Sequence, residues 1–285
     1  MIFYKTDEEI ELIRQSCLIV SKVLGHCATR IRPGITGKEL DKEAEEIIRD
    51  YNAVPGFKGY NGFPSTLCIS KNEAVVHGIP NDQAFEDGDI VSIDCGSYVN
   101  SYFGDAAFTF AVGDVAEDTM ELLRVTYTSL YMGIEKAVEG NRLGDIGFAI
   151  QEYTERENEY GVVRELVGHG IGKALHEAPE VPNYGKRGRG IILKEGLVIA
   201  IEPMINQGKR YIRQADDGWT IITKDHEPSA HYEHTVAVRK GEADILSTHE
   251  YVLEGIKNNP NVKQVSLKSE IFAHPKLKYG ETGLN

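Results

Sequence analysis

The chain has 285 residues and a formal net charge of −13, because 44 Asp and Glu outnumber 31 Lys and Arg. This length allows one large domain or two small ones, and a content of 41% hydrophobic and 26% charged residues excludes a disordered or fibrous chain. The acidic balance argues against unspecific binding to DNA or RNA, which depends on Lys and Arg, and against binding to anionic membranes.

The N-terminal segment places acidic residues before its apolar stretch, whereas a signal peptide begins with basic residues. No run of about 18 apolar residues occurs, so we expect no transmembrane helix. The four cysteines form no CxxC pair and no dense framework. We therefore expect a cytoplasmic protein with reduced thiols that are buried as small hydrophobic side chains, at Cys17, Cys27, Cys68 and Cys95.

Two helices are predicted in the first fifty residues. A capping box at Thr6 and Glu9 opens a helix that reaches about residue 30, and apolar residues recur along it at helical spacing. A second capping box at Thr36 and Glu39 opens another helix after a Pro-Gly break. The pattern then changes to strands, which we expect over residues 66–70, 89–96 and 105–113.

The same order of elements starts again in the second half of the chain. A helix is predicted over residues 117–139 and another up to Tyr160, followed by strands over 196–205, 218–225 and 234–240. Two helix-helix-sheet halves indicate an internal duplication with a cleft at their junction, although chance could produce the spacing. We expect residues 1–248 to form one domain, and 249–285 to form a C-terminal extension that is partly helical or mobile.

Two aspartates occupy unfavourable positions in a predicted hairpin. With the turn centred on Val99 and Asn100, Asp94 would face Asp105 directly, where like charges destabilise a sheet. Asp94 also interrupts an apolar strand. A cation between the carboxylates would explain both positions; the alternatives are a different register, or an aspartate that acts as a turn residue or hydrogen-bond acceptor.

Three further residues are candidate metal ligands. Glu202 ends an apolar strand, where an unpaired carboxylate would cost several kcal/mol, Glu233 begins another strand, and His169 lies in a glycine-rich segment. Taken singly, each Glu suits a solvated face and the His suits a core position. Together, four carboxylates and one imidazole balance two divalent cations and suit Mn, Fe, Co or Zn. Two such ions catalyse hydrolysis.

Five motifs follow one another in a recognisable order: AVVHGIP (74–80), SIDCGSYVNSYFGDAA (92–107), GHGIGKALHE (168–177), AIEPM (200–204) and HYEHTVAV (231–238). With them the chain resembles the bacterial-type type I methionine aminopeptidases over about residues 3–248. The resemblance implies an α/β (α+β) pita-bread fold with two pseudo-symmetric helix-helix-sheet halves around a central antiparallel sheet. It also implies removal of N-terminal methionine from nascent proteins and peptides with a small second residue, by water that a dinuclear metal centre activates.

The resemblance further implies individual roles. Two divalent ions (Co, Mn, Fe or Zn) would be held by Asp94, Asp105, His169, Glu202 and Glu233, with Asp105 and Glu233 bridging both. Glu202 would also be the general base, His176 would stabilise the oxyanion and His77 would hydrogen-bond the scissile peptide. The methionine pocket would consist of Tyr60, Phe63, Cys68, His77, His176 and Trp219, with Phe57 nearby. By residue type alone, these aromatics are more typical of core packing.

Some features depart from the family or leave alternatives open. Phe57 and Asn61 stand where many relatives have Cys and His, which puts the subsite preference in doubt. Aminopeptidase P or prolidase of the same fold is an alternative, and so is a non-catalytic interaction module, although all five ligand positions are intact. Expected partners are nascent N-termini, with no DNA and no membrane, and we expect a monomer. The basic loop 186–189 is a candidate for transient ribosome contact, a solvated loop being the alternative.

Overall fold

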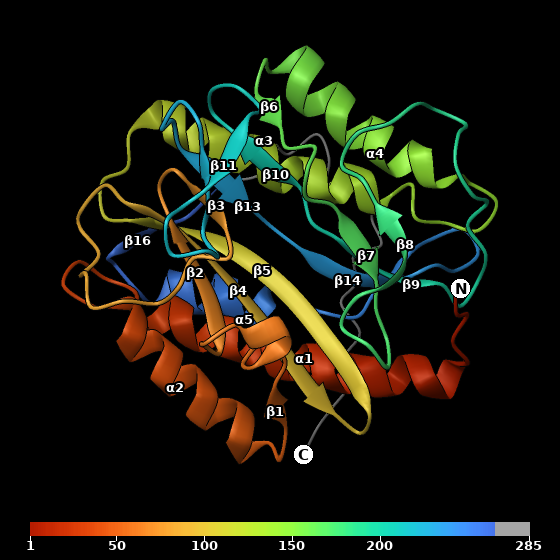
Figure 1. Cartoon of the computed structure of the whole chain (residues 1–285), viewed down its shortest axis with the longest axis horizontal. Coiled ribbons are helices and arrows are strands. Elements are labelled where there is room, and N and C mark those ends of the chain that lie inside the picture. The colour runs from red at the N-terminus through yellow and green to blue at the C-terminus, as the bar shows by residue number, and fades with distance from the viewer. Residues whose placement is uncertain (266–285) are drawn as a thin grey trace.

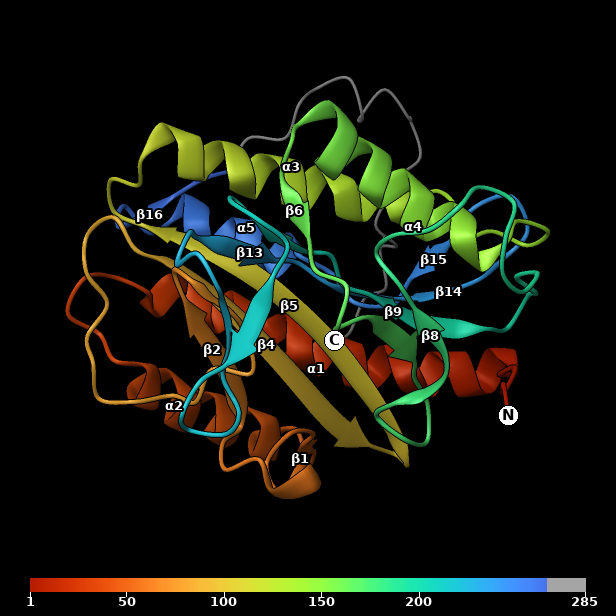
Figure 2. The same cartoon turned by 45° about the horizontal axis from the view of Figure 1, so that its top comes forward.

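The computed structural model describes residues 1–265, which form two pairs of helices with antiparallel strands between them. The first pair is α1 (Asp7–Arg30) and α2 (Gly37–Asp50), and the second pair is α3 (Glu117–Ile134) and α4 (Leu143–Gln151). The two pairs lie on opposite sides of the strands (Figures 1 and 2). Each pair precedes its own group of strands in the chain, as predicted for two helix-helix-sheet halves.

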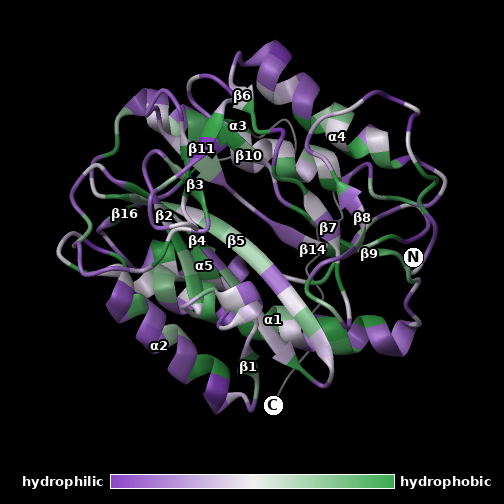
Figure 3. Ribbon diagram, in the orientation of Figure 1, coloured by the Kyte–Doolittle hydropathy of each residue, from purple (hydrophilic) through white to green (hydrophobic). Residues whose placement is uncertain are grey.

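Both predicted capping boxes are confirmed. At the start of α1, the Glu9 amide donates to Thr6 Oγ1 at 3.3 Å, and the Thr6 amide donates to Glu9 Oε2 at 3.0 Å. The same reciprocal pair joins Thr36 and Glu39 at the start of α2. These bonds satisfy amides that have no partner within the helix. Figure 3 shows hydrophilic residues along the outer side of α2 and hydrophobic residues on the strands that it covers.

The long hairpin of β4 (Ile90–Val99) and β5 (Tyr102–Val112) forms the centre of a five-stranded antiparallel sheet. β1 and β2 pair with β4, and β16 pairs with the outer edge of β5. A single 3-10 turn, η1 (Tyr60–Gly62), connects β1 to β2. The other bounds are β1 Val54–Pro55, β2 Leu67–Lys71 and β16 Val262–Lys263.

The predicted register of the central hairpin is wrong by two residues. Its turn lies at Asn100 and Ser101, so Asp94 pairs with Ala107, and Asp105 pairs with Gly96. Asn100 and Ser101 take positive φ angles of 52° and 68°. A two-residue type I′ turn requires such angles at both positions, and hairpins favour this turn because its twist matches that of the two strands. A shift of two residues keeps side chains on the same face, so the two aspartates are diagonal neighbours.

The second half contains another five-stranded antiparallel sheet, in the order β15-β14-β9-β7-β8. Two three-stranded sheets, β13-β10-β6 and β11-β12-β3, lie beside the five-stranded sheets. The bounds are β3 Ala74–Val76, β6 Gly161–Val162, β7 Gly168–Gly170, β8 Glu177–Val181, β9 Val198–Ile201, β10 Met204–Asn206, β11 Ile212–Gln214, β12 Ile221–Thr223, β13 Ser229–His231, β14 His234–Ala237 and β15 Asp244–Ile245.

The helices of the second half are shorter than predicted. α3 ends at Ile134 because the following chain turns to pair with the opposite segment, where the Glu139 amide donates to the Arg239 carbonyl at 2.9 Å. α4 continues into a wider π-helical segment, η2 (Glu152–Glu157). The chain leaves this helix before Tyr160, since Glu159 takes a left-handed conformation with φ 61°.

Hydrogen bonds join β5 of the first half to the segment 231–235 of the second. The Glu233 amide donates to the Ala107 carbonyl at 3.0 Å, and Thr235 Oγ1 donates to the Asp105 carbonyl at 2.8 Å. Thr109 Oγ1 donates to the His231 carbonyl at 2.7 Å. Candidate ligands from the two halves are therefore held next to each other by backbone contacts.

The segment that follows residue 248 packs against the first half. A helix forms within residues 249–259 as predicted, α5 (Glu250–Lys257), and it lies on α1. The Asn259 side chain donates to the carbonyls of Ala28 and Ile31 at the end of α1. The rest of the predicted extension, residues 266–285, lies outside the described residues. Among the helices of residues 1–265, none is both long enough and apolar enough to cross a membrane.

Candidate metal centre

A cavity of about 220 Å³ lies where the two halves meet, and it brings the predicted site residues together. The strands β2 to β5 contribute one side, and the segments around β7, β9, β10 and β12 contribute the other. All the residues predicted as metal ligands, catalytic groups or pocket walls line it: Tyr60, Phe63, Cys68, His77, Asp94, Asp105, His169, His176, Glu202, Trp219 and Glu233.

Three of the five candidate ligands converge on one point. One ligand atom each from Asp105, His169 and Glu233 lie within 4.8 Å of one another. The other two flank this group: Asp94 is the diagonal neighbour of Asp105 on the same face of the hairpin, and Glu202 Oε1 lies 3.5 Å from His169 Nε2. Each half of the chain thus supplies part of the donor set.

The aspartates of the hairpin repel each other when both are ionised. Burial raises the pKa of Asp94 to about 7. Burial and the charges of Asp94 and Glu202 raise the pKa of Asp105 well above its usual range. A proton shared between the two side chains relieves this repulsion, and a cation would relieve it without protonation.

Glu202 and Glu233 lie at breaks in the strands of the second half. Pro203 has no amide hydrogen to donate, so the predicted strand 196–205 splits into β9 and β10 with Glu202 between them. Glu233 lies between β13 and β14. Burial is the main cause that raises the pKa of both carboxyls, and nearby carboxylates add to it.

His169 presents a free ring nitrogen to the carboxylates. Its Nδ1 lies 2.9 Å from the Gly170 carbonyl, which can only accept a hydrogen bond, so Nδ1 carries the proton. Nε2 then holds a lone pair, 3.9 Å from Asp105 Oδ2. Burial lowers the pKa of His169 to about 3, which keeps the ring neutral. A neutral imidazole with its second nitrogen fixed by a carbonyl is the form that binds metals.

Several buried carboxylate oxygens of the candidate ligands are free to bind a cation. Asp94 Oδ1, Asp105 Oδ1 and Glu233 Oε1 are buried and have no hydrogen-bond partner among residues 1–265. An unsatisfied buried carboxylate oxygen is costly. Hard oxygen donors with one imidazole suit divalent first-row metals, so these residues fit a metal centre in both charge and chemistry.

His77 enters the cavity from a strained backbone position. It follows β3 with φ 60°, a conformation that is rare for residues other than glycine. The next residue must be glycine, because a Cβ at Gly78 would lie 2.1 Å from the Ile69 carbonyl oxygen. Burial and the neighbouring His176 lower the pKa of His77. Such strain is characteristic of functional positions.

His176 lies on the opposite side, beside the candidate ligands. Its ring is 4.3 Å from the His169 ring, centroid to centroid, and its Nδ1 is 2.8 Å from Tyr60 Oη. Burial lowers the pKa of His176. If the Tyr60 hydroxyl donates to Nδ1, Nε2 carries the proton and is available as a donor.

Aromatic and apolar side chains form the rest of the wall. The Phe63 and Trp219 rings meet edge to face at 5.2 Å, and Cys68 pairs with Asp94 across β2 and β4. Phe57 and Asn61 also line the cavity. Sequence reasoning missed the remaining apolar lining residues, although most lie within or next to the quoted motifs: Val76, Leu166, Val167, Leu175 and Met204.

His231 is a further residue of the centre that the sequence reasoning did not single out. It is 1% exposed, and its Nε2 lies 4.0 Å from Glu202 Oε2. That nitrogen has no hydrogen-bond partner in the described part of the chain. Burial lowers the pKa of His231 to about 3, so the ring is neutral. Its place at the start of the motif HYEHTVAV is the signal that could have identified it.

Comparison with known proteins gives one consistent result. The model of metallopeptidase family M24 matches residues 11–240. A methionine aminopeptidase of Clostridium acetobutylicum is 50% identical over 248 residues, 87% of this chain and 99% of that protein. The crystal structure of methionine aminopeptidase from Rickettsia prowazekii matches with a TM-score of 0.85 at 39% identity, over 87% of this chain and 100% of that one. A prolidase from Pyrococcus furiosus matches with a TM-score of 0.71 at 26% identity, but only 66% of its length is covered.

Proposed function

The chain belongs to metallopeptidase family M24, and we propose that it removes N-terminal methionine from peptides and nascent proteins whose second residue is small. It has the mixed pita-bread fold expected from the resemblance. The observation that carries the proposal is the convergence of Asp105, His169 and Glu233 at the base of an aromatic-walled cavity. The identity of 50% to a methionine aminopeptidase supports it.

The five candidate ligands, Asp94, Asp105, His169, Glu202 and Glu233, would hold two divalent cations. When bound, such ions polarise the scissile carbonyl and lower the pKa of water so that it attacks at neutral pH. Glu202 would accept the proton of that water and pass it to the leaving amine.

The pocket would select methionine by shape and by contact with sulfur. The edge-to-face pair of Phe63 and Trp219 lines the cavity, together with Tyr60 beside His176. Thioethers contact aromatic rings favourably, by about 0.3–1.5 kcal/mol each. Burial and the charge of Asp94 raise the pKa of Cys68 well above its usual range, so its thiol stays neutral beside an apolar side chain.

Substrate preference is the direct test of this proposal. We expect the purified protein, supplied with Co²⁺, Mn²⁺, Fe²⁺ or Zn²⁺ in turn, to release methionine from Met-Ala-Ser. We expect it to leave Arg-Pro-Pro intact. Proline is the second residue of this peptide, as the alternative prolidase or aminopeptidase P activity would require. Peptide products are quantified by chromatography. Cleavage of Arg-Pro-Pro with sparing of Met-Ala-Ser would contradict the proposal.

The two cavity histidines are expected to contribute to turnover and not to metal binding. We expect His176→Ala to lower kcat about 10²–10³-fold, as loss of an oxyanion donor does, and His77→Ala to lower kcat/KM. Metal content, measured by elemental analysis after gel filtration, should remain close to that of the unmodified protein. Wholesale loss of metal from either variant would refute the assigned roles, because His169 and not these residues is the imidazole ligand.

We propose that the protein acts in the cytoplasm as a monomer, with residues 1–248 as the catalytic domain and 249–285 as an extension. The exposed side chains of Lys186, Arg187 and Arg189 support the loop 186–189 as a site of transient contact with the ribosome. The long-range contacts of α5 with α1 support an extension that packs on this domain.

A further inference from the structure

A buried ion pair joins the N-terminal segment to the loop that carries His176. Lys5 Nζ lies 2.5 Å from Glu177 Oε2, and the exposed fractions of the two side chains are 4% and 6%. Glu177 directly follows His176 at the start of β8, where successive side chains point to opposite faces. We infer that Lys5 and Glu177 are positioning residues that hold His176 in its place for turnover, an inference that rests on the proposed function.

The loop needs such an anchor because its tip is exposed. Residues 171–176 connect β7 to β8; Lys173, Ala174 and His176 are exposed, whereas Leu175 between them is buried. At its start the loop is held by the Ile171 amide, which donates to the Val198 carbonyl at 3.1 Å, and by the Gly172 carbonyl, which accepts from the Phe103 amide at 2.8 Å. The part that carries His176 lies beyond these two bonds.

Glu177 closes this second part of the loop with both carboxylate oxygens. Oε1 accepts a hydrogen bond from the Ala174 amide at 3.3 Å, and Oε2 binds Lys5. His176 lies between the two anchored positions, 174 and 177. The loop also packs on the lysine stem, since a Cβ at Gly172 would lie 2.6 Å from Lys5 Cε and 2.7 Å from Glu177 Oε1. The pair therefore restrains the segment on either side of the histidine.

Lys5 is itself fixed to the second sheet. Its amide donates to the Gly196 carbonyl at 2.7 Å, and its Nζ also donates to the Phe3 carbonyl at 3.2 Å. The adjacent Tyr4 pairs with Leu197, which precedes β9. Through this attachment, the position of the loop that carries His176 is fixed relative to β9, the strand that leads to Glu202. Small displacements of a catalytic group lower turnover steeply, and breaking a buried ion pair leaves an uncompensated charge that displaces its surroundings.

A double-mutant cycle separates positioning from general stability. We expect Lys5→Met to lower kcat for Met-Ala-Ser about tenfold, with KM changed less than about twofold and metal content unchanged. In the His176→Ala background, the same substitution should change kcat less than about twofold, because the group it positions is gone. Lys5→Arg, which keeps the charge, should recover most of the activity.

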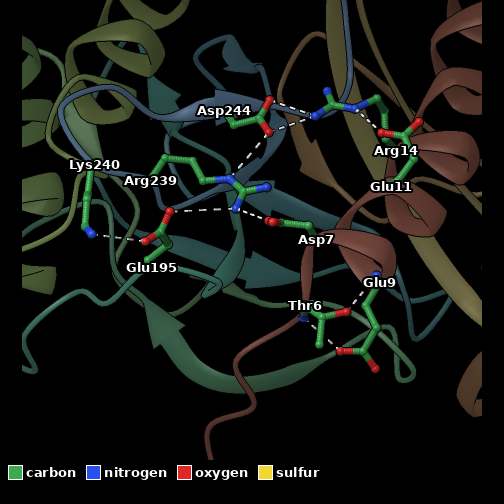
Figure 4. A network of polar contacts seen from close by, with 9 residues as sticks. All are labelled: Thr6, Asp7, Glu9, Glu11, Arg14, Glu195, Arg239, Lys240 and Asp244. Atoms are coloured by element: carbon green, nitrogen blue, oxygen red, sulfur yellow. Dashed lines mark hydrogen bonds and ion pairs between the residues drawn. The ribbon is translucent and has the colours of Figure 1, made fainter.

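Asp7→Asn is the matched control. Asp7 lies two residues after Lys5 in the chain, and its carboxylate pairs with Arg239 in the network of Figure 4. The substitution removes the charge of this ion pair and leaves the loop of His176 unchanged. We expect unchanged kcat. Should Lys5→Met fail to fold, Glu177→Gln takes its place, since Gln keeps an acceptor for the Ala174 amide and weakens only the ion pair.

Hydrogen exchange gives a readout that does not depend on activity. We expect the amides of residues 172–176 to exchange at least about tenfold faster in Lys5→Met than in the unmodified protein. Equal loss of kcat in both backgrounds of the cycle, or unchanged exchange together with unchanged kcat, would overturn the inference. Absence of Met-Ala-Ser cleavage by the unmodified protein would instead count against the proposed function, and the exchange result would still decide whether the pair anchors the loop.

Discussion

Glu202→Gln is expected to lower kcat about 10²–10⁴-fold, the range that general acid-base catalysis contributes. The amide has nearly the volume of the carboxyl. It also keeps an oxygen that can face His169, whose Nε2 lies 3.5 Å from Glu202 Oε1. It cannot accept a proton from water or deliver one to the leaving amine. We therefore expect the loss to appear in kcat, with KM for Met-Ala-Ser changed by less than about threefold. Steady-state kinetics at saturating Co²⁺ or Mn²⁺ measure both constants.

Glu180→Gln is the control for this substitution. Glu180 is exposed on β8, where it pairs with His169 across the two strands, so the same chemical change is made near the centre but outside the cavity. We expect its kcat to equal that of the unmodified protein. A Glu202→Gln protein that retains more than about a tenth of the kcat would exclude Glu202 as the general base.

Asp105→Asn is expected to abolish turnover and to remove the stabilisation by metal. Asp105 is 3% exposed, and it is the shared neighbour of Asp94, His169 and Glu233. A ligand at a hundredfold excess over its Kd stabilises a protein by about 2.7 kcal/mol. For a chain of 285 residues, whose entropy of unfolding is about 0.6 kcal/mol/K, this corresponds to a rise in Tm of about 4–5 °C. We expect that rise in the unmodified protein after chelation and metal return, and its absence in the variant.

The metal-free forms should respond in the opposite sense. Four carboxylates crowd the cavity, and their charges raise one another's pKa. Neutralising one of them relieves the repulsion, so we expect metal-free Asp105→Asn to melt a few °C above the metal-free unmodified protein. Asp50→Asn, an exposed change at the end of α2, should alter neither Tm. A variant that keeps both activity and the metal-dependent rise in Tm would show that Asp105 is not a ligand.

Local signals identified most elements and the residues of the centre. The capping boxes at Thr6 and Thr36 act within one turn, so sequence spacing alone predicts them. Asp94 and Glu202 are candidate ligands because a carboxylate in an apolar strand conflicts with its surroundings, and such conflicts mark functional sites. The family motifs indicate Glu233 and His169. All the predicted lining residues do lie around one cavity.

Predictions that depended on pairing or on a remote partner were less complete. The hairpin turns at Asn100 and Ser101 and not at Val99 and Asn100, a difference of one position that sequence spacing does not determine. α3 ends early because residues 138–139 pair with Arg239, about a hundred positions later in the chain.

The sequence by itself determined the class of chemistry, because residue type and local order carry it: four carboxylates and an imidazole within motifs of a metallopeptidase family. The tertiary structure alone decided which atoms face one another. It places His231 near Glu202 and Lys5 against Glu177, pairs that are 29 and 172 residues apart in the chain. The physical reason is that burial and ion pairing arise from packing between segments that are distant in the chain, and no local pattern of residues encodes that packing.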